Sequence, residues 1–208
     1  MAKETISFAR GAPSADILPA EAVREAAART LESDWQRALS YGTGKGHPGL
    51  CEWIADLHGV KPEQVMVTNG SMEAASLLFR HFVGAGDRVV IEQPTYDRTL
   101  LLLKQAGAEL LTARLEEDGV DVAGNEEAWS RGSPRLAHII PNFHNPAGCT
   151  LSEAKRRRLV ELAAEHDFVL FEDDPYRLIS FAGPAGETML EMDEADRVAE
   201  LLPDHIRL

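Results

Sequence analysis

The stretch that decides the fold is Phe171-Glu172-Asp173-Asp174-Pro175-Tyr176, where the apolar run 168–171 passes into two acids and a tyrosine. The run has the length of a buried strand, so the polar residues come where that strand would end. A second apolar run, 136–140, ends in Pro141-Asn142-Phe143-His144-Asn145-Pro146. Open α/β sheets bind ligands at the carboxyl ends of their strands. The two clusters therefore predict a ligand site at one edge of a sheet.

Strands and helices are expected to alternate along the rest of the chain. The expected strands are 65–68, 88–91, 109–113, 136–140 and 168–171, and the expected helices are 19–35, 50–57, 69–83, 95–106 and 152–166. This alternation is typical of βαβ units and predicts a mainly parallel sheet flanked by helices. The basic run 155–158 is expected to form a solvated helix face. After Glu187 the chain is acidic, and we expect an amphipathic helix at most and no further strand.

Composition excludes several classes of partner. The hydrophobic content of 44% is enough for a core, and the formal net charge of -13 argues against nucleic acids and anionic membrane surfaces, which need a basic footprint. No apolar stretch approaches the length of a membrane-spanning helix, and the N-terminus has no signal-peptide core. Cys51 and Cys149 do not form a disulfide framework. We expect a cytoplasmic protein that binds small molecules.

Taken together, the two motifs make the chain resemble the N-terminal and central part of a class I/II aminotransferase. This is the fold-type-I family that uses pyridoxal 5'-phosphate, and the match runs from about Phe8 to about Gly183. The spacing and the Asp-Asp-Pro-Tyr motif are most similar to those of one subgroup. This subgroup contains the 2-aminoadipate and aromatic aminotransferases and the enzyme-like half of MocR/GntR regulators. The resemblance implies a large domain of mainly parallel sheet, truncated before the last strands and the C-terminal small domain. It also divides the chain into an arm and helix (1–40), an incomplete cofactor-binding large domain (41–186) and an acidic tail of uncertain structure (187–208).

The ring of the cofactor is assigned to residues at the predicted strand ends. An Asp and a Tyr three residues apart, with an Asn nearby, suit a pyridine ring that carries a phenolic oxygen. By the resemblance, Asp173 keeps the pyridine nitrogen protonated, while Tyr176 and Asn145 hydrogen-bond the phenolic oxygen. Tyr96 is expected to stack on the ring, although a core tyrosine is the plainer interpretation.

The phosphate is assigned to Asn69-Gly70-Ser71-Met72, which lies between a predicted strand and a predicted helix. Helix N-termini offer free N–H groups and a positive dipole end, although a plain N-cap would use the same residues. The resemblance implies that Tyr41 reaches the cofactor phosphate of the partner in a homodimer; a loop tyrosine is the alternative. It also implies that Gly11 and Asn145 line the side of the amino acid and 2-oxo acid substrates.

No metal site is expected, because the histidines lack the spacing of ligand pairs. His47, His138 and His144 are interpreted as local hydrogen-bonding groups.

The resemblance also identifies what the sequence lacks. The lysines are Lys3, Lys45, Lys61, Lys104 and Lys155. None follows Asp173, where the family has its Schiff-base lysine, and the family's C-terminal arginine is also missing. We therefore expect no catalytic residue in this chain, no transamination by it alone, and marginal stability with exposed apolar edges.

Three functions remain open from the sequence. The first is transamination of an amino acid with a 2-oxo acid, as in the family. The second is a non-catalytic remnant that at most binds the cofactor, and the third is a lyase on the same scaffold. A generic nucleotide-binding domain would leave Asn145, Asp173 and Tyr176 without a common explanation.

Overall fold

The computed structural model describes residues 14–181, 183–202 and 205–207. The chain divides into two compact units, Met1–Thr43 and Gly44–Leu208. The described part of the first unit contains the 3-10 helix η1 (Ala15–Ile17) and helices α1 (Ala20–Ser33) and α2 (Trp35–Ala38). None of its described residues is buried, so the part of this unit that the structure describes has no core of its own.

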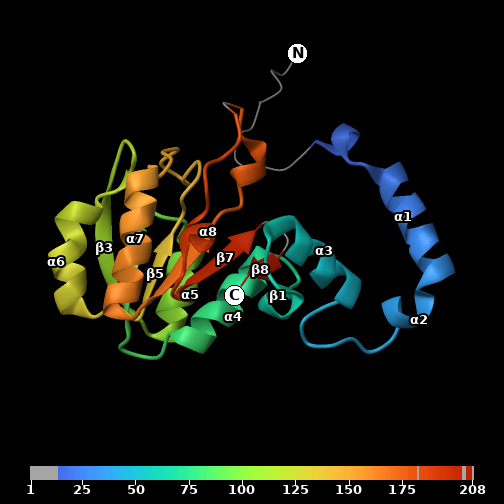
Figure 1. The fold of residues 1–208 in the computed structure, drawn as a ribbon, viewed down its shortest axis with the longest axis horizontal. Coiled ribbons are helices and arrows are strands. Elements are labelled where there is room, and N and C mark those ends of the chain that lie inside the picture. The colour runs from blue at the N-terminus through green and yellow to red at the C-terminus, as the bar shows by residue number, and fades with distance from the viewer. Residues whose placement is uncertain (1–13, 182, 203–204, 208) are drawn as a thin grey trace, which may run out of the picture. The chain divides into compact units, whose positions relative to one another are not determined.

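The second unit carries the sheet. Its helices are α3 (Pro48–His58), η2 (Pro62–Gln64), α4 (Ser71–Phe82), α5 (Asp97–Ala106), α6 (Val122–Gly132), α7 (Glu153–His166), η3 (Arg177–Ile179) and α8 (Met189–Met192). Its strands are β1 (Val65–Val67), β2 (Arg88–Gln93), β3 (Glu109–Glu116), β4 (Gly119–Val120), β5 (Leu136–Ile139), β6 (Val169–Asp173), β7 (Val198–Leu202) and β8 (His205–Arg207). In the described residues these strands form one sheet in the order β1-β8-β7-β6-β5-β2-β3-β4 (Figure 1).

The centre of the sheet is parallel, as predicted. Strand β2 pairs in parallel with β3 and β5, β5 with β6, and β6 with β7, whereas β8 and β4 are antiparallel to their neighbours. Parallel strands need crossover connections, and α5 and α7 supply two of them. The carboxyl ends of β5, β6 and β7 therefore lie at one edge of the sheet.

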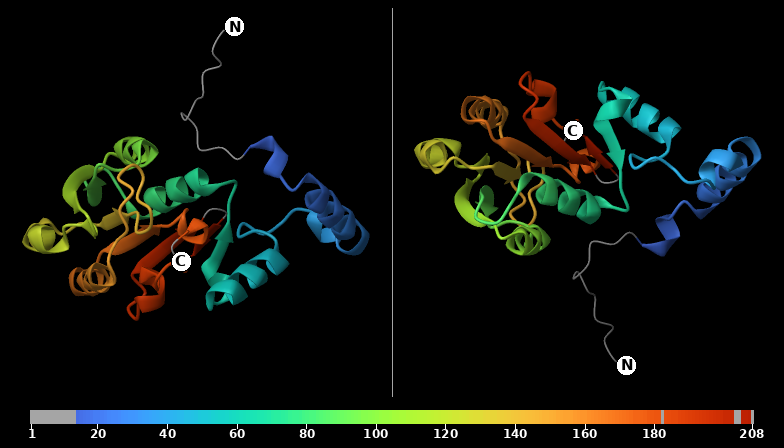
Figure 2. Two further views of the ribbon diagram at one scale, coloured as in Figure 1. Left: turned by 90° about the horizontal axis from the view of Figure 1, so that it is seen from above. Right: turned by 90° about the horizontal axis from the view of Figure 1, so that it is seen from below.

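Alternate residues of each strand face opposite layers of helices. Val89 and Ile91 of β2 pack in the cluster that includes Leu78 and Phe79 of α4 and Leu103 of α5. Val90 faces the other way, into the cluster formed with residues of α6 and α7. Figure 2 shows α4 and α5 on one side of the sheet and α6 and α7 on the other. Both faces are covered, which explains why the strands read as continuous apolar runs.

The end of the chain differs from the sequence expectation. We expected at most an amphipathic helix after Glu187 and no further strand, but 189–192 form α8, and β7 and β8 follow. Strand β7 pairs in parallel with β6, with Glu200 opposite Glu172. Glu200, in the middle of β7, interrupts the apolar pattern from which a strand would be predicted. The other residues Val198, Ala199 and Leu201 are apolar and buried.

Candidate functional site

A cavity opens at the carboxyl edge of the sheet, within the second unit. It is lined by Ser71, Met72, Ala75, Tyr96, Thr99, Ile140, Asn145, Asp173, Pro175, Tyr176 and Leu201. These residues come from the first turns of α4 and α5, from the segments that follow β5 and β6, and from β7. The fold thus brings together six of the residues that the sequence assigned to a cofactor: Ser71, Met72, Tyr96, Asn145, Asp173 and Tyr176.

Asp173 is the last residue of β6, and its side chain is 14% exposed at the cavity. Its Oδ2 lies 3.0 Å from Nε2 of His138, a fully buried residue of β5. The neighbouring Asp174 is turned away from the cavity into the protein, where its Oδ2 accepts a hydrogen bond from Asn142 Nδ2 (2.7 Å). The two adjacent acids therefore have different roles, and Asp173 alone of the pair is available to a ligand.

Asn145 and Tyr176 lie on the segments that follow β5 and β6. Asn145 Nδ2 donates to the Tyr176 hydroxyl at 3.4 Å, so both polar ends point to one place. A buried pair holds the Asn145 segment: His144 Nε2 lies 3.1 Å from Glu92 Oε2 of β2, and His144 Nδ1 accepts the Ala147 N–H (3.2 Å). Because Nδ1 is an acceptor, the neutral ring carries its proton on Nε2, which lies near the Glu92 carboxylate but makes no hydrogen bond in the described structure.

The first turn of α4 forms another wall of the cavity. Gly70 is its N-cap residue at φ 96° and ψ 162°, a conformation that is essentially restricted to glycine. The N–H groups of Ser71 and Met72 are in the first turn, where the helix has no acceptor for them. Gly70 flanks the cavity without lining it. The turn offers two N–H groups, a hydroxyl and the positive end of the helix dipole to an anion.

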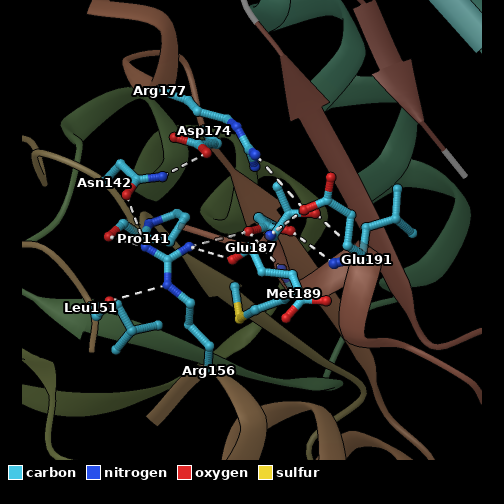
Figure 3. A network of polar contacts seen from close by, with 12 residues as sticks. Pro141, Asn142, Leu151, Arg156, Asp174, Arg177, Glu187, Met189 and Glu191 are labelled. Atoms are coloured by element: carbon cyan, nitrogen blue, oxygen red, sulfur yellow. Dashed lines mark hydrogen bonds and ion pairs between the residues drawn. The ribbon is translucent and has the colours of Figure 1, made fainter. Parts of the chain in front are cut away.

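Next to Asp173 lies a buried polar network centred on Arg156 of α7 (Figure 3). Its guanidinium donates to the carbonyl oxygens of Leu151 (3.0 Å) and Pro141 (3.3 Å) and to Asn142 Oδ1 (2.8 Å). Asn142 in turn donates a hydrogen bond to Asp174, the neighbour of Asp173. The expectation that 155–158 form a solvated face is thus wrong for Arg156, which is 3% exposed. The helical period turns this one arginine inward while Arg157 stays exposed.

Two carboxyl groups of the network have raised pKa values. Burial, followed by the nearby Glu200 carboxyl, raises the pKa of Glu172 to about 8. Its oxygens accept the N–H groups of Met189 (3.0 Å) and Leu190 (3.1 Å) at the start of α8. Burial also raises the pKa of Asp174, although the hydrogen bond from Asn142 opposes the change. Glu172 therefore fixes α8 against β6.

The cavity does not test the other sequence assignments. Gly11 lies outside the described residues. Tyr41 belongs to the first unit, and its side chain is exposed. Lys45 Nζ donates to the Glu63 carbonyl oxygen (2.6 Å), and Lys155 pairs with Glu116 (2.7 Å) and Asp118 (2.6 Å). No lysine is among the residues that line the cavity in the described structure.

Several residues of the site were not found from the sequence. Thr99 and Ala75 line the cavity one helical turn after residues that were assigned, and their spacing could have indicated this. Leu201 was missed together with β7. His138 was interpreted only as a local hydrogen-bonding group, and no sequence signal pairs it with Asp173. Across the described residues there is no group of acids, histidines and cysteines that could hold a metal ion, and no helix is long and apolar enough to cross a membrane.

Known proteins are similar to this chain in sequence and in fold. Residues 3–202 match the family model described as aminotransferase class I and II. Aromatic-amino-acid aminotransferase 1 of Thermococcus litoralis is 34% identical over 209 residues, which cover 95% of this chain and 50% of that protein. The probable rhizopine catabolism regulatory protein MocR of Rhizobium meliloti is 31% identical, over 94% of this chain and 40% of that protein.

A solved structure extends the likeness to the fold. The α-aminoadipate aminotransferase LysN of Thermus thermophilus, in complex with N-(5'-phosphopyridoxyl)-L-leucine, superposes with a TM-score of 0.88 at 33% identity, over 94% of this chain and 51% of that one. The chain therefore spans about half the length of the relatives it matches, and that half has the large-domain fold of fold-type-I aminotransferases. On this sequence match and this fold, the chain belongs to the class I and II aminotransferase family.

Proposed function

We propose that the cavity at the carboxyl edge binds pyridoxal 5'-phosphate without a lysine bond, as the cofactor-holding part of an aminotransferase. The observation that carries the proposal is the convergence of Asp173, Asn145, Tyr176 and the first turn of α4 on one cavity. These groups match the two ends of the cofactor: an acid for the ring nitrogen and donors for the phenolic oxygen at one end, and helix N–H groups for the phosphate at the other. Nothing in the cavity wall matches the aldehyde, because no lysine lines it.

Each residue would have a distinct task. Asp173 would hold the proton at the ring nitrogen, since a carboxylate stabilises a cationic N–H. Asn145 and Tyr176 would orient the phenolic oxygen, and Tyr96 would cover one face of the ring. Ser71 and Met72 would hold the phosphate. When bound, the cofactor supplies an electron sink for the substrate α-carbon.

For the whole protein we propose transamination between an amino acid and a 2-oxo acid, in a homodimer. Support comes from relatives named as aromatic-amino-acid and α-aminoadipate aminotransferases. In this sequence the proton shuttle at the α-carbon has no candidate, since no lysine follows Asp173. We therefore propose binding without turnover for the chain as given.

The test is a pair of absorbance titrations, one with pyridoxal 5'-phosphate and one with pyridoxine 5'-phosphate, which has no aldehyde. We expect saturable binding of both with affinities of the same order, and no stoichiometric lysyl adduct by mass spectrometry after borohydride reduction. Asp173→Ala should weaken both, whereas Asp56→Asn, on the exposed face of α3, should weaken neither. Absence of saturable binding would refute the proposal, and a stoichiometric adduct at Lys45 would refute binding without a lysine bond.

A further inference from the structure

His138 touches the acid that the proposed function assigns to the ring nitrogen, and the family resemblance did not supply this contact. It lies on β5 opposite Phe171 of β6, and Asp173 is two residues further along the same face. The imidazole is fully buried, and its Nε2 is 3.0 Å from Asp173 Oδ2. One oxygen of the Asp173 carboxylate is therefore occupied from inside the protein.

Two aromatic rings fix the orientation of this imidazole. Phe171 meets it edge-on with centroids 5.2 Å apart and an interplanar angle of 69°, and Phe79 of α4 does so at 6.1 Å and 60°. The two phenyl rings also pack against each other at 5.5 Å and 76°. The two edge-to-face contacts of the imidazole, with the phenyl rings packed against each other, leave it little freedom to rotate, because the core around it is close-packed.

The other nitrogen of the ring decides which proton form fits. In the described structure Nδ1 of His138 is buried and has no hydrogen-bond partner. A proton on Nδ1 alone would set the lone pair of Nε2 against a carboxylate oxygen at 3.0 Å. A doubly protonated ring would leave the buried Nδ1–H without an acceptor. The geometry fits a neutral ring with its proton on Nε2, donated to Asp173.

We propose that His138 is a positioning residue for the cofactor: its Nε2–H fixes the Asp173 carboxylate so that the remaining oxygen faces the cavity. This inference rests on the proposed function only for what enters the cavity. The ring does not reach the cavity wall, since His138 is absent from the lining. It acts through Asp173, by restricting the carboxylate to one rotamer and satisfying its inner oxygen.

The first test uses substitutions that separate the hydrogen bond from packing. His138→Gln keeps an N–H donor at the end of a side chain of similar reach, and His138→Met keeps apolar bulk without a donor. A hydrogen bond to a charged group is strong enough that losing it should weaken pyridoxine 5'-phosphate binding by about tenfold or more. We expect His138→Met to show this loss and His138→Gln to keep most of the affinity. In an Asp173→Asn background the His138→Met change should add little, because the charged acceptor is already gone. Equal losses in both variants, or a full additional loss in that background, would show that His138 only fills space.

The second test needs no cofactor. Nitrogen-15 NMR of the chain labelled at histidine should show His138 protonated at Nε2 and bare at Nδ1, with the signal assigned by its absence in His138→Gln. The Nε2 proton should exchange slowly and shift in Asp173→Asn. A proton on Nδ1, or a signal insensitive to Asp173→Asn, would overturn the inference. Failure of wild-type chain to bind either phosphate ester would contradict the proposed function, while this spectrum would still decide whether His138 holds Asp173.

Discussion

The two ends of the cavity are held in different ways. We call the part lined by Asp173 and Asn145 the ring end and the part formed by the first turn of α4 the phosphate end, after the groups of the proposed cofactor. At the ring end, Asp173 and Asn145 are supported by buried side chains: His138 contacts the first, and the Glu92–His144 pair anchors the second. At the phosphate end, the groups that face the cavity belong to the first turn of α4 and include main-chain N–H groups. Side-chain substitutions should therefore affect the ring end strongly and the phosphate end weakly.

The comparison also locates what the fold must preserve. The ring end depends on an interior polar network that runs from Arg156 through Asn142 to Asp174, whereas the phosphate end depends on a backbone conformation at Gly70. Buried polar networks are costly to break, because each broken link leaves another buried group without a partner.

The largest effect is expected from Arg156→Met. Removing the arginine leaves three buried acceptors, Asn142 Oδ1 and the carbonyl oxygens of Pro141 and Leu151, without their donor, which costs about 3–5 kcal/mol of unfolding free energy. Urea denaturation followed by circular dichroism measures this. Arg157→Met is the matched control, because the neighbouring arginine is 53% exposed and pairs only with surface acids, so its loss should cost at most about 1 kcal/mol. Similar losses in both variants would break the comparison, since the ring end would then have no special support.

The pH dependence of stability tests the same network. Burial raises the folded-state pKa of Glu172 to about 8, against an ordinary value of 4.5. The folded chain binds this proton more tightly than the unfolded chain, so the Glu172 contribution to stability is present below pH 4.5 and is lost as the pH rises towards 8. The slope reaches at most about 1.4 kcal/mol per pH unit. Glu172→Gln should remove this slope, and the difference between wild type and variant at pH 5 and pH 8 measures it. Glu52→Gln, at an exposed position of α3, should leave the slope unchanged.

Asp173→Asn tests whether the charge of this carboxylate matters at the ring end. The amide keeps the size of the side chain but loses the charge that would hold the ring proton, and a charge-assisted hydrogen bond contributes about 1.5–3 kcal/mol. We expect the Kd for pyridoxine 5'-phosphate to rise at least about tenfold, with little change in the urea midpoint. Unchanged affinity would mean that the acid does not face the ligand.

The smallest effect is expected at the phosphate end, from Ser71→Ala. The main-chain N–H groups remain and keep most of the hydrogen bonds to the phosphate, so only one hydroxyl donor is lost, at a cost of about 1 kcal/mol. Affinity for pyridoxal 5'-phosphate should fall about fivefold, and that for pyridoxal, which has no phosphate, should not change. Ser76→Ala, further along α4, is the control. A larger fall than that of Asp173→Asn would reverse the order of the two ends.

The sequence predicted the parallel centre of the sheet because its strands are short apolar runs between helices. It did not predict β7, since Glu200 interrupts the apolar pattern of a strand whose other residues are buried. Helix α6 was also missed: Gly124 and Asn125 weaken its propensity, and Asp121 supplies the cap by accepting the Gly124 N–H (2.8 Å).

For the candidate site, sequence predicted the residues that face the cavity better than those behind them. Asp173, Asn145 and Tyr176 stand at strand ends, where position alone suggests a role. Arg156 and His138 could not be assigned in the same way, because their roles depend on which neighbours the packed sheet places beside them. An arginine in a basic run is ordinarily solvated, and only the helix phase, together with Asn142 and the Pro141 carbonyl oxygen, makes this one interior.

The pairing of β1 has a consequence for the order in which the chain can be assembled. In the described residues β1 pairs with β8 alone. Val65 of β1 can therefore enter the sheet only after Arg207, its pairing partner, has been synthesised. Contacts of such long sequence separation form late, because the loop between them must close first. The turn that follows β1 passes through Gly70 and leads to Ser71, which lines the cavity. During synthesis, the core that α4 forms with β2 and α5 can therefore assemble before β1 is paired, and a nascent chain stopped before β8 would lack the partner of the strand that leads into α4.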